Sequence, residues 1–242
     1  MNIVWTELSK IVQAVMETGG RSLTAAIEAI GRTLSAPFDS EKRRQVSFTV
    51  AMIALSAKMA KADGVVTFDE IRAFEELFVI PSNERKNVAR LFNLAKQDVA
   101  GFESYAKKLG ELCRDSQGDC ALLEDIVDGL FHIAKADGLL HEGELAYLQR
   151  VAEVFAISPA QFRRIKSRHV VEDTADPYYI LGVNPEDSLD DIKQAYRRQI
   201  RDTHPDRLMA RGVPAEFIKI ANDRLAALNS AFALIEEERL AS

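Results

Sequence analysis

Apolar residues recur at intervals of three and four along most of this chain, which is the spacing of a helix with one buried face. The clearest stretches are residues 48–59, 122–133, 189–200 and 218–235, and weaker ones cover 82–96, 98–112 and a segment that begins at Ser158. No segment alternates polar and apolar residues as a half-buried strand does. Glycine and proline are scarce, at 12 and 7 of 242 residues. We therefore predict an all-α protein.

A short segment of the chain occurs twice. The sequence AKADGVV at residues 60–66 returns as AKADGLL at residues 134–140. Each copy follows one of the apolar helices and precedes an acidic helix start, at 67–71 and at 141–145. Self-similarity of this kind indicates one supersecondary unit used twice. We predict two similar helix–loop–helix units that pack around a pseudo-twofold axis.

Carboxylates in and after the two repeated loops offer hard oxygen ligands, which divalent cations prefer. The candidates are Asp63, Glu70, Asp137 and Glu144. The loops are shorter than the twelve-residue EF-hand loop. Helix capping is a second interpretation, because Gly64 and Gly138 suit left-handed helix ends and Thr67 has the capping-box spacing to Glu70. A divalent cation here and a purely structural role, with no cofactor required, both stay open.

A basic helix leads into the tripeptide at residues 204–206, which we call the H-P-D loop. Basic residues lie four apart beside the apolar stripe of residues 189–200. Pro205 cannot continue the helix and displaces the residue before it from helical backbone, so a loop is expected there. We assign residues 207–213 to the same loop and start a second long helix at Pro214. This turn presents His204 and Asp206 on a loop at the end of the basic helix.

The segments on either side of the tripeptide indicate which kind of domain it belongs to. The sequence DPYYILGV at residues 176–183 precedes the basic helix, and LNSAF at residues 228–232 lies in the last helix. In order, spacing and chemistry, the three segments resemble the J-domain, the module that drives Hsp70 chaperones through their ATP cycle. Gln199 stands where that family usually has leucine, which weakens one core contact. The resemblance implies a small helical hairpin whose basic helix and H-P-D loop bind an Hsp70 of the DnaK type. The binding residues that it implies are Lys193, Tyr196, Arg197, Arg198, Arg201, His204, Pro205, Asp206 and Arg207.

The region in front of this hairpin resembles the TerB-like domain of tellurite-resistance proteins, whose two-fold repeat has acidic loops. A TerB-like domain followed by a J-domain is the arrangement of the DjlA family of bacterial co-chaperones. The resemblance covers roughly residues 45–242. We predict an N-terminal amphipathic segment at 1–40, a TerB-like domain at 41–170, a linker at 171–175 and a J-domain at 176–242. Members of that family typically begin with a transmembrane anchor, whereas charged residues interrupt the apolar positions of residues 1–40.

These features lead us to expect a cytoplasmic protein. The N-terminal segment is expected to pack on the protein or in a homodimer, or to make peripheral contact with the inner membrane.

Composition excludes several classes of function. The formal net charge of −6 argues against a nonspecific nucleic-acid binder. Cys113 and Cys120, the two cysteines, form no CxxC pair, so neither a zinc ribbon nor a redox motif is available. No histidine has a neighbourhood that suggests catalysis, and we expect no enzyme.

The predicted function is that of an Hsp70 co-chaperone that stimulates the partner's ATPase, with the TerB-like domain targeting or regulating it. The alternative is a metal-responsive adaptor or dimerisation protein in stress or envelope signalling. The client stays unknown.

Overall fold

The structure is a computed structural model that describes residues 5–6, 9–10, 12–13, 40–62, 74–75, 78, 80–97, 102–103, 106–107, 121–136, 138–169, 176–211, 213 and 217–241. Within these residues all regular structure is helical, which confirms the predicted class. The helices are α3 (Ser40–Ala62), α5 (Arg85–Gln97), α7 (Ala121–Ala134), α8 (Glu142–Val154), α9 (Pro159–His169), α10 (Pro177–Leu181), α11 (Leu189–Thr203), α12 (Pro205–Arg211) and α13 (Ile218–Ala241). The first copy of the repeated loop, the acidic start at 67–71, most of the predicted helix at 98–112, and both cysteines fall outside the described residues.

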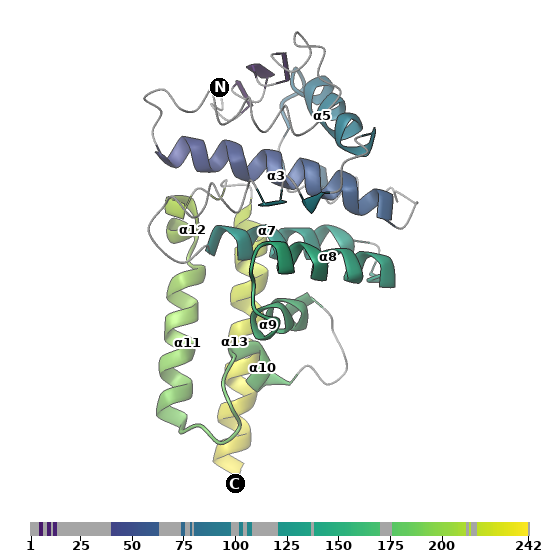
Figure 1. The fold of residues 1–242 in the computed structure, drawn as a ribbon. Helices are drawn as coiled ribbons and strands as arrows, with labels where there is room; N and C mark the ends of the chain where they lie inside the picture. Colours follow the sequence, from purple (N-terminus) through teal and green to yellow (C-terminus); the bar gives the residue numbers. More distant parts are fainter. Residues whose placement is uncertain are drawn as a thin grey trace.

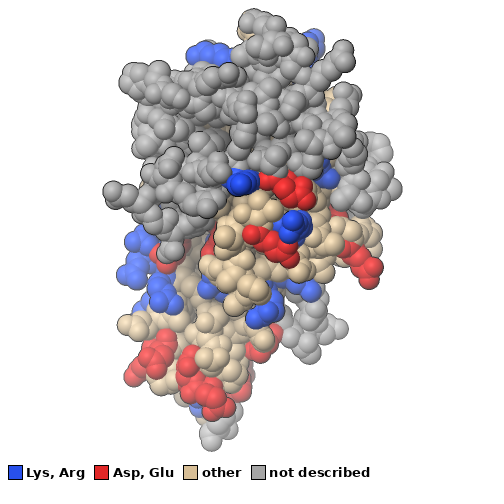
Figure 2. Space-filling model, in the orientation of Figure 1, with Lys and Arg blue, Asp and Glu red and all other residues tan. Residues whose placement is uncertain are grey.

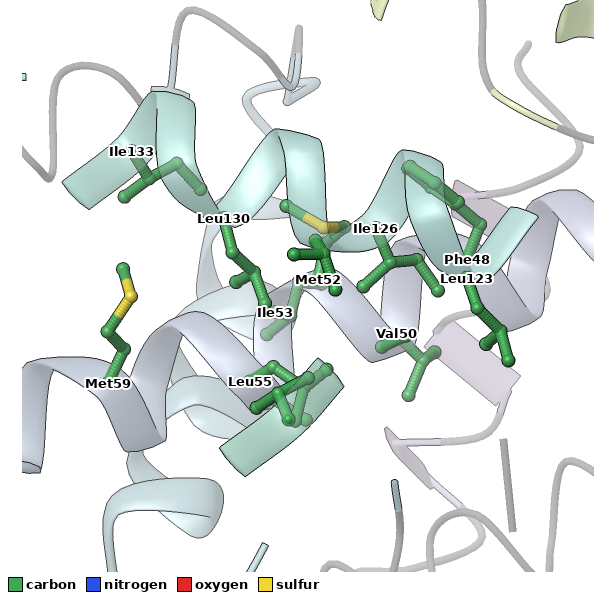
Figure 3. Close-up of a cluster of buried hydrophobic side chains, with 14 of the residues drawn as sticks. Phe48, Val50, Met52, Ile53, Leu55, Met59, Leu123, Ile126, Leu130 and Ile133 are labelled. Atoms are coloured by element: carbon green, nitrogen blue, oxygen red, sulfur yellow. The ribbon is translucent and has the colours of Figure 1, made fainter. Parts of the chain in front are cut away.

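The two repeated apolar helices, α3 and α7, lie side by side in the centre of the core. They run in the same direction, with Phe48 near Leu123 at one end and Met59 near Ile133 at the other (Figure 3). Every side chain from residue 48 to residue 59 is buried. α3 is the central helix of this core, because α5, α7, α8 and α12 all pack against it.

The remaining helices of this part form layers around α3. α5 packs on one side of α3, while α7 and α8 lie on the opposite side (Figure 1). α9 packs on α7 as the next layer and faces the C-terminal helices. Gly138, between α7 and α8, has a φ of +88°, so it adopts the left-handed conformation that the sequence predicts for it.

The C-terminal helices form the predicted antiparallel hairpin of α11 and α13, with the short α10 leading into it (Figure 1). Capping side chains fix where these helices begin: Asp176 accepts a hydrogen bond from the Tyr178 amide, and Ser188 accepts one from the Asp191 amide. The hairpin has a small core of its own, composed of Tyr178, Ile180, Leu181, Ile192, Leu228, Ala231 and Ile235.

Residues 205–211 form the helix α12, so the assignment of residues 207–213 to a loop was wrong. Pro205 stops α11 but also suits the first position of the next helix, where a missing N–H costs nothing. Asp206 lies in the first turn of α12, where a negative charge is favourable. The description of α13 begins at Ile218, beyond the start predicted at Pro214.

The apolar core of the first part continues into the C-terminal part. Phe217, just before α13, meets the ring of Phe48 edge to face at 4.6 Å between centroids and that of Phe78 at 5.1 Å. α12 contacts α3, and α13 contacts α7. The end of the hairpin that carries the H-P-D loop therefore packs against the helices α3 and α7. The side chains that enter the shared core are Leu208, Val213, Phe217, Ile220 and Ala221.

Candidate functional site

The H-P-D loop is exposed to solvent, and a hydrogen bond joins two of its own residues. His204 is the C-cap of α11, with φ −58° and ψ 135°, and Pro205 opens α12. The His204 ring turns back over the loop, where Nδ1 accepts a hydrogen bond from the Asp206 amide at 3.2 Å and lies 3.6 Å from Asp206 Oδ2. The two side chains are 58% and 80% exposed. The loop therefore offers an imidazole and a carboxylate in a fixed arrangement that a partner can reach.

A charged pair bridges the loop. Arg207 Nη1, at the start of α12, donates a hydrogen bond to Asp202 Oδ1, near the end of α11. Thr203, between Asp202 and the loop, is buried. These contacts hold the ends of the two helices together around the H-P-D loop. Sequence reasoning assigned Arg207 to the partner-facing set and missed Asp202 and Thr203, because a separation of five residues across a proline is not a helical spacing.

The exposed face of α11 is basic close to the H-P-D loop. Arg197, Arg198 and Arg201 are exposed, and none of them forms an ion pair with another residue that the structure describes. Figure 2 shows Lys and Arg side chains on the flank formed by α11 and acidic side chains at the far end of the hairpin, where the first turn of α11 holds Asp190 and Asp191. Such a distribution gives the region near the loop a local positive potential.

Lys193 and Tyr196 lie in the contact between α11 and α13. Lys193 Nζ lies 3.5 Å from Glu236 Oε1. The Tyr196 ring stacks on Phe232, with centroids 4.3 Å apart, and its hydroxyl donates a hydrogen bond to Asn229 Oδ1 at 2.8 Å. The sequence grouped both residues with the partner-facing set. In the structure they also fix the orientation of the basic helix on α13.

Gln199 makes a polar contact where the J-domain family usually has a leucine. Its Nε2 donates a hydrogen bond to the Leu181 carbonyl at the end of α10. Carbonyls in the last turn of a helix lack partners within the helix, so this bond satisfies one of them. The departure from the family pattern thus ties α11 to α10.

Comparisons with known proteins find two domain families in the chain. The family described as tellurite resistance protein TerB matches residues 49–167, and the DnaJ domain matches residues 176–226. Relatives named Co-chaperone protein DjlA align with most of the chain. Those from Photobacterium profundum, Shewanella oneidensis and Escherichia coli K12 are 28%, 26% and 25% identical, covering 83%, 86% and 84% of this chain and 80%, 84% and 83% of the relative. The chain is DjlA-like, with a TerB-like domain followed by a J-domain. No solved structure matches it.

Of the four carboxylates considered as cation ligands in this DjlA-like protein, Glu144 is the one that the structure describes, and Asp63, Glu70 and Asp137 lie outside the described residues. Glu144 is buried, and its Oε2 accepts a hydrogen bond from the His141 amide at 2.9 Å, the contact of a capping box. No group of three or more potential ligands gathers among the described residues. Glu144 therefore has a structural role at the start of α8.

Charged side chains are buried where the J-domain of the DjlA-like protein meets its TerB-like helices, α3 to α9. Arg224 Nη1 of α13 lies 3.3 Å from Asp125 Oδ1 of α7. Asp128, further along α7, bonds His169 Nε2 at 2.9 Å and lies 3.5 Å from Arg168 Nη1. Burial alone would raise the pKa of Asp128, but His169, Arg168 and Arg224 lower it well below its usual range. Burial, followed by Arg224, lowers the pKa of Arg168 to about 9, which leaves it charged at neutral pH.

The N-terminal segment of the DjlA-like protein is described at a few positions. Trp5 and Val12 are buried in the same core as α3, so these positions pack on the protein itself. Within the described part of the chain, no helix combines the length and the apolar character needed to cross a membrane.

Proposed function

We propose that this protein stimulates ATP hydrolysis by an Hsp70 of the DnaK type through its H-P-D loop. The observation that carries the proposal is the open loop at the end of a basic helix, in a chain whose net charge is −6. A bulk positive charge is absent, so the basic face is a local docking feature. The likeness to relatives named Co-chaperone protein DjlA supports a co-chaperone role.

The first step is encounter with the partner. Arg197, Arg198 and Arg201 steer an acidic surface of the Hsp70 toward α11, because charge complementarity raises the association rate. Salt screens such contacts, so the concentration needed for half-maximal stimulation rises with ionic strength. Lys193 and Tyr196 hold α11 against α13 and keep the basic face in register with the loop.

The second step is coupling. His204 and Asp206 contact the Hsp70 and bind its hydrolysing conformation better than its resting one, which shifts the equilibrium between the two. Coupling of this kind is typically worth about 5-fold to 150-fold. Arg207 orients the loop through Asp202 and offers a further contact. The chain performs no chemistry of its own, because hydrolysis takes place in the partner.

The TerB-like helices target or regulate this activity. The support is their packing: the J-domain is joined to them through an apolar core and through the buried pair of Arg224 and Asp125. Whatever binds the TerB-like helices is thereby placed at a fixed distance from the H-P-D loop.

The substitution His204→Gln tests the proposal. Stimulation of a DnaK-type ATPase by the full chain should be lost, because the amide cannot replace the imidazole that the loop presents. The melting temperature should stay unchanged, since the His204 side chain is mostly exposed. His141→Gln alters another exposed histidine, at the start of α8, and should stimulate like wild type. Full stimulation by His204→Gln would contradict the proposal.

A further inference from the structure

The J-domain of this protein is held by two separate apolar cores. One is the core of the hairpin, built around Ile192, Leu228 and Ile235. The other is the core of the TerB-like helices, and the segment directly after the H-P-D loop enters it. Leu208, Val213 and Phe217 are 6%, 2% and 3% exposed there. The segment that fixes the loop on its C-terminal side thus depends on the neighbouring domain.

Phe217 is the residue most tightly surrounded by that neighbour. Its ring packs edge to face against Phe48 and Phe78. On another side it lies against Gly129 of α7, where an added Cβ would come within 3.0 Å of Phe217 Cε1. Interiors packed this closely respond to the loss or gain of a single carbon atom. The position of Phe217 is therefore set by helices outside the J-domain.

Leu208 connects this packing to the H-P-D loop. Its side chain is buried in the shared core, and its amide donates a hydrogen bond to the His204 carbonyl at 3.1 Å. The Arg207 amide donates to the same carbonyl at 2.9 Å, and the Val213 amide donates to the Leu208 carbonyl at 3.0 Å. A continuous path of backbone bonds runs from the shared core to the residue that faces the partner.

Buried charges fix the same junction. Arg224 and Asp125, with side chains 13% and 8% exposed, pair across α13 and α7. On the other side of the hairpin, Gly182 at the end of α10 lies so close to Arg164 of α9 that an added Cβ would be 3.2 Å from Arg164 Cδ. These contacts add to the apolar packing between the J-domain and the TerB-like helices. The docking does not cover the loop, since His204 and Asp206 remain largely exposed.

We propose that docking on the TerB-like helices positions the H-P-D loop for its action on Hsp70, with Phe217 and Leu208 as the positioning residues. The inference rests on the proposed stimulation of Hsp70 and adds to it a role for the TerB-like helices. Displacement of Phe217 frees α12 and with it the His204 carbonyl. The basic face of α11 stays in place on α13, so binding of the partner continues while coupling falls.

The test compares the full chain carrying Phe217→Ala with wild type and with Phe74→Ala. Phe74 is another buried ring, 7% exposed, that itself lies in the TerB-like part, as do its aromatic partners Phe78 and Phe92. Phe217→Ala should lower the maximal stimulation of the Hsp70 ATPase about fivefold or more, at an unchanged half-saturating concentration. Phe74→Ala should stimulate like wild type. Phe217→Leu, which keeps most of the apolar contact, should restore most of the activity.

Hydrogen exchange gives a second readout that does not depend on Hsp70. In Phe217→Ala, the amides of Arg207 and Leu208 should exchange faster than in wild type, while those of Ile192 and Leu228 stay protected by the core of the hairpin. Should Phe217→Ala fail to fold, the milder Val213→Ala takes its place in both measurements.

The outcomes separate this inference from the proposed function. A wild-type chain that fails to stimulate any DnaK-type Hsp70 overturns the proposed function, and the exchange data then decide whether docking holds the loop. Unchanged exchange at Arg207 and Leu208 overturns the positioning role. Equal or greater stimulation by Phe217→Ala also overturns it, and greater stimulation would identify the docking as inhibitory.

Discussion

Tyr196 carries two contacts within the hairpin, and they can be separated. Tyr196→Phe removes the hydroxyl that bonds Asn229 but keeps the ring on Phe232. A hydrogen bond contributes about 0.5–1.5 kcal/mol, and one at the surface lies at the low end. We expect urea denaturation to show a loss of about 0.5 kcal/mol in the free energy of unfolding. Stimulation of Hsp70 should be unchanged. A loss of stimulation at unchanged stability would instead show that the Tyr196 hydroxyl contacts the partner, as the sequence predicts.

Single residues show how far sequence reasoning reaches. The left-handed conformation of Gly138 follows from a local preference, and the structure has it. The bond between Gln199 and the Leu181 carbonyl could not be predicted, because it joins residues 18 apart through a side chain that the family pattern treats as a core position. A contact of this kind forms only when two helices pack together. The spacing of residues along one helix does not show which helix it packs on.

Among the secondary-structure elements, α10 ends at a glycine that has two constraints. Gly182 has a φ of +62°, and an added Cβ would come within 3.2 Å of Arg164 Cδ. Left-handed backbone costs a residue with a side chain about 1–2 kcal/mol. Gly182→Ala should therefore lower the free energy of unfolding by about that amount. Gly143→Ala is the matched control, because this exposed glycine lies inside α8 and alanine should raise stability by about 0.5–1 kcal/mol. Effects of the same sign would contradict the backbone assignment at Gly182.

The contact between α7 and α9 depends on the charge of Asp128. Its pKa in the folded protein lies below the ordinary value of 3.8, so the contribution of Asp128 to stability is complete above that value and declines as the pH falls below it. Asp128→Asn leaves Arg168 buried without its counter-charge, which typically costs about 3–5 kcal/mol. Urea titrations should show this difference at neutral pH and a smaller one near pH 3. A difference independent of pH would show that the charge is not the cause.

Whole helices were predicted better than the segments between them. The apolar periods of α3, α7, α11 and α13 and the start of α9 at Pro159 are strong local signals, and all of these helices are present. The helix α12 was missed because Pro205 was interpreted only as a stop. Its apolar residue Leu208 is buried in the core of the distant TerB-like helices, and α12 contacts α3. The formation of α12 therefore depends on tertiary contacts, which the local spacing of apolar residues does not reveal.

At the scale of the molecule, the core extends across the two domain families. The matches at 49–167 and 176–226 correspond to separate patterns in the sequence, yet Phe217 and Ile220 share a core with Phe48 of α3. An apolar stripe shows that a helix face is buried but not which helix covers it. Domain families could thus be inferred from sequence, while their docking, and the orientation that it gives the H-P-D loop, required the structure.

A shared core predicts shared unfolding. Trp5 is the single tryptophan, and its ring lies 6.3 Å from Phe78, which in turn contacts Phe217. Trp5 fluorescence therefore follows the TerB-like core next to the docking site, while exchange of the Ile192 and Leu228 amides follows the hairpin. In wild type the two probes should give one coincident urea transition, because the shared core couples the unfolding of the two parts. Phe217→Ala should separate them, with the two cores then unfolding at different urea concentrations. Two distinct transitions in wild type would show that each part is stable alone and that docking contributes little to either.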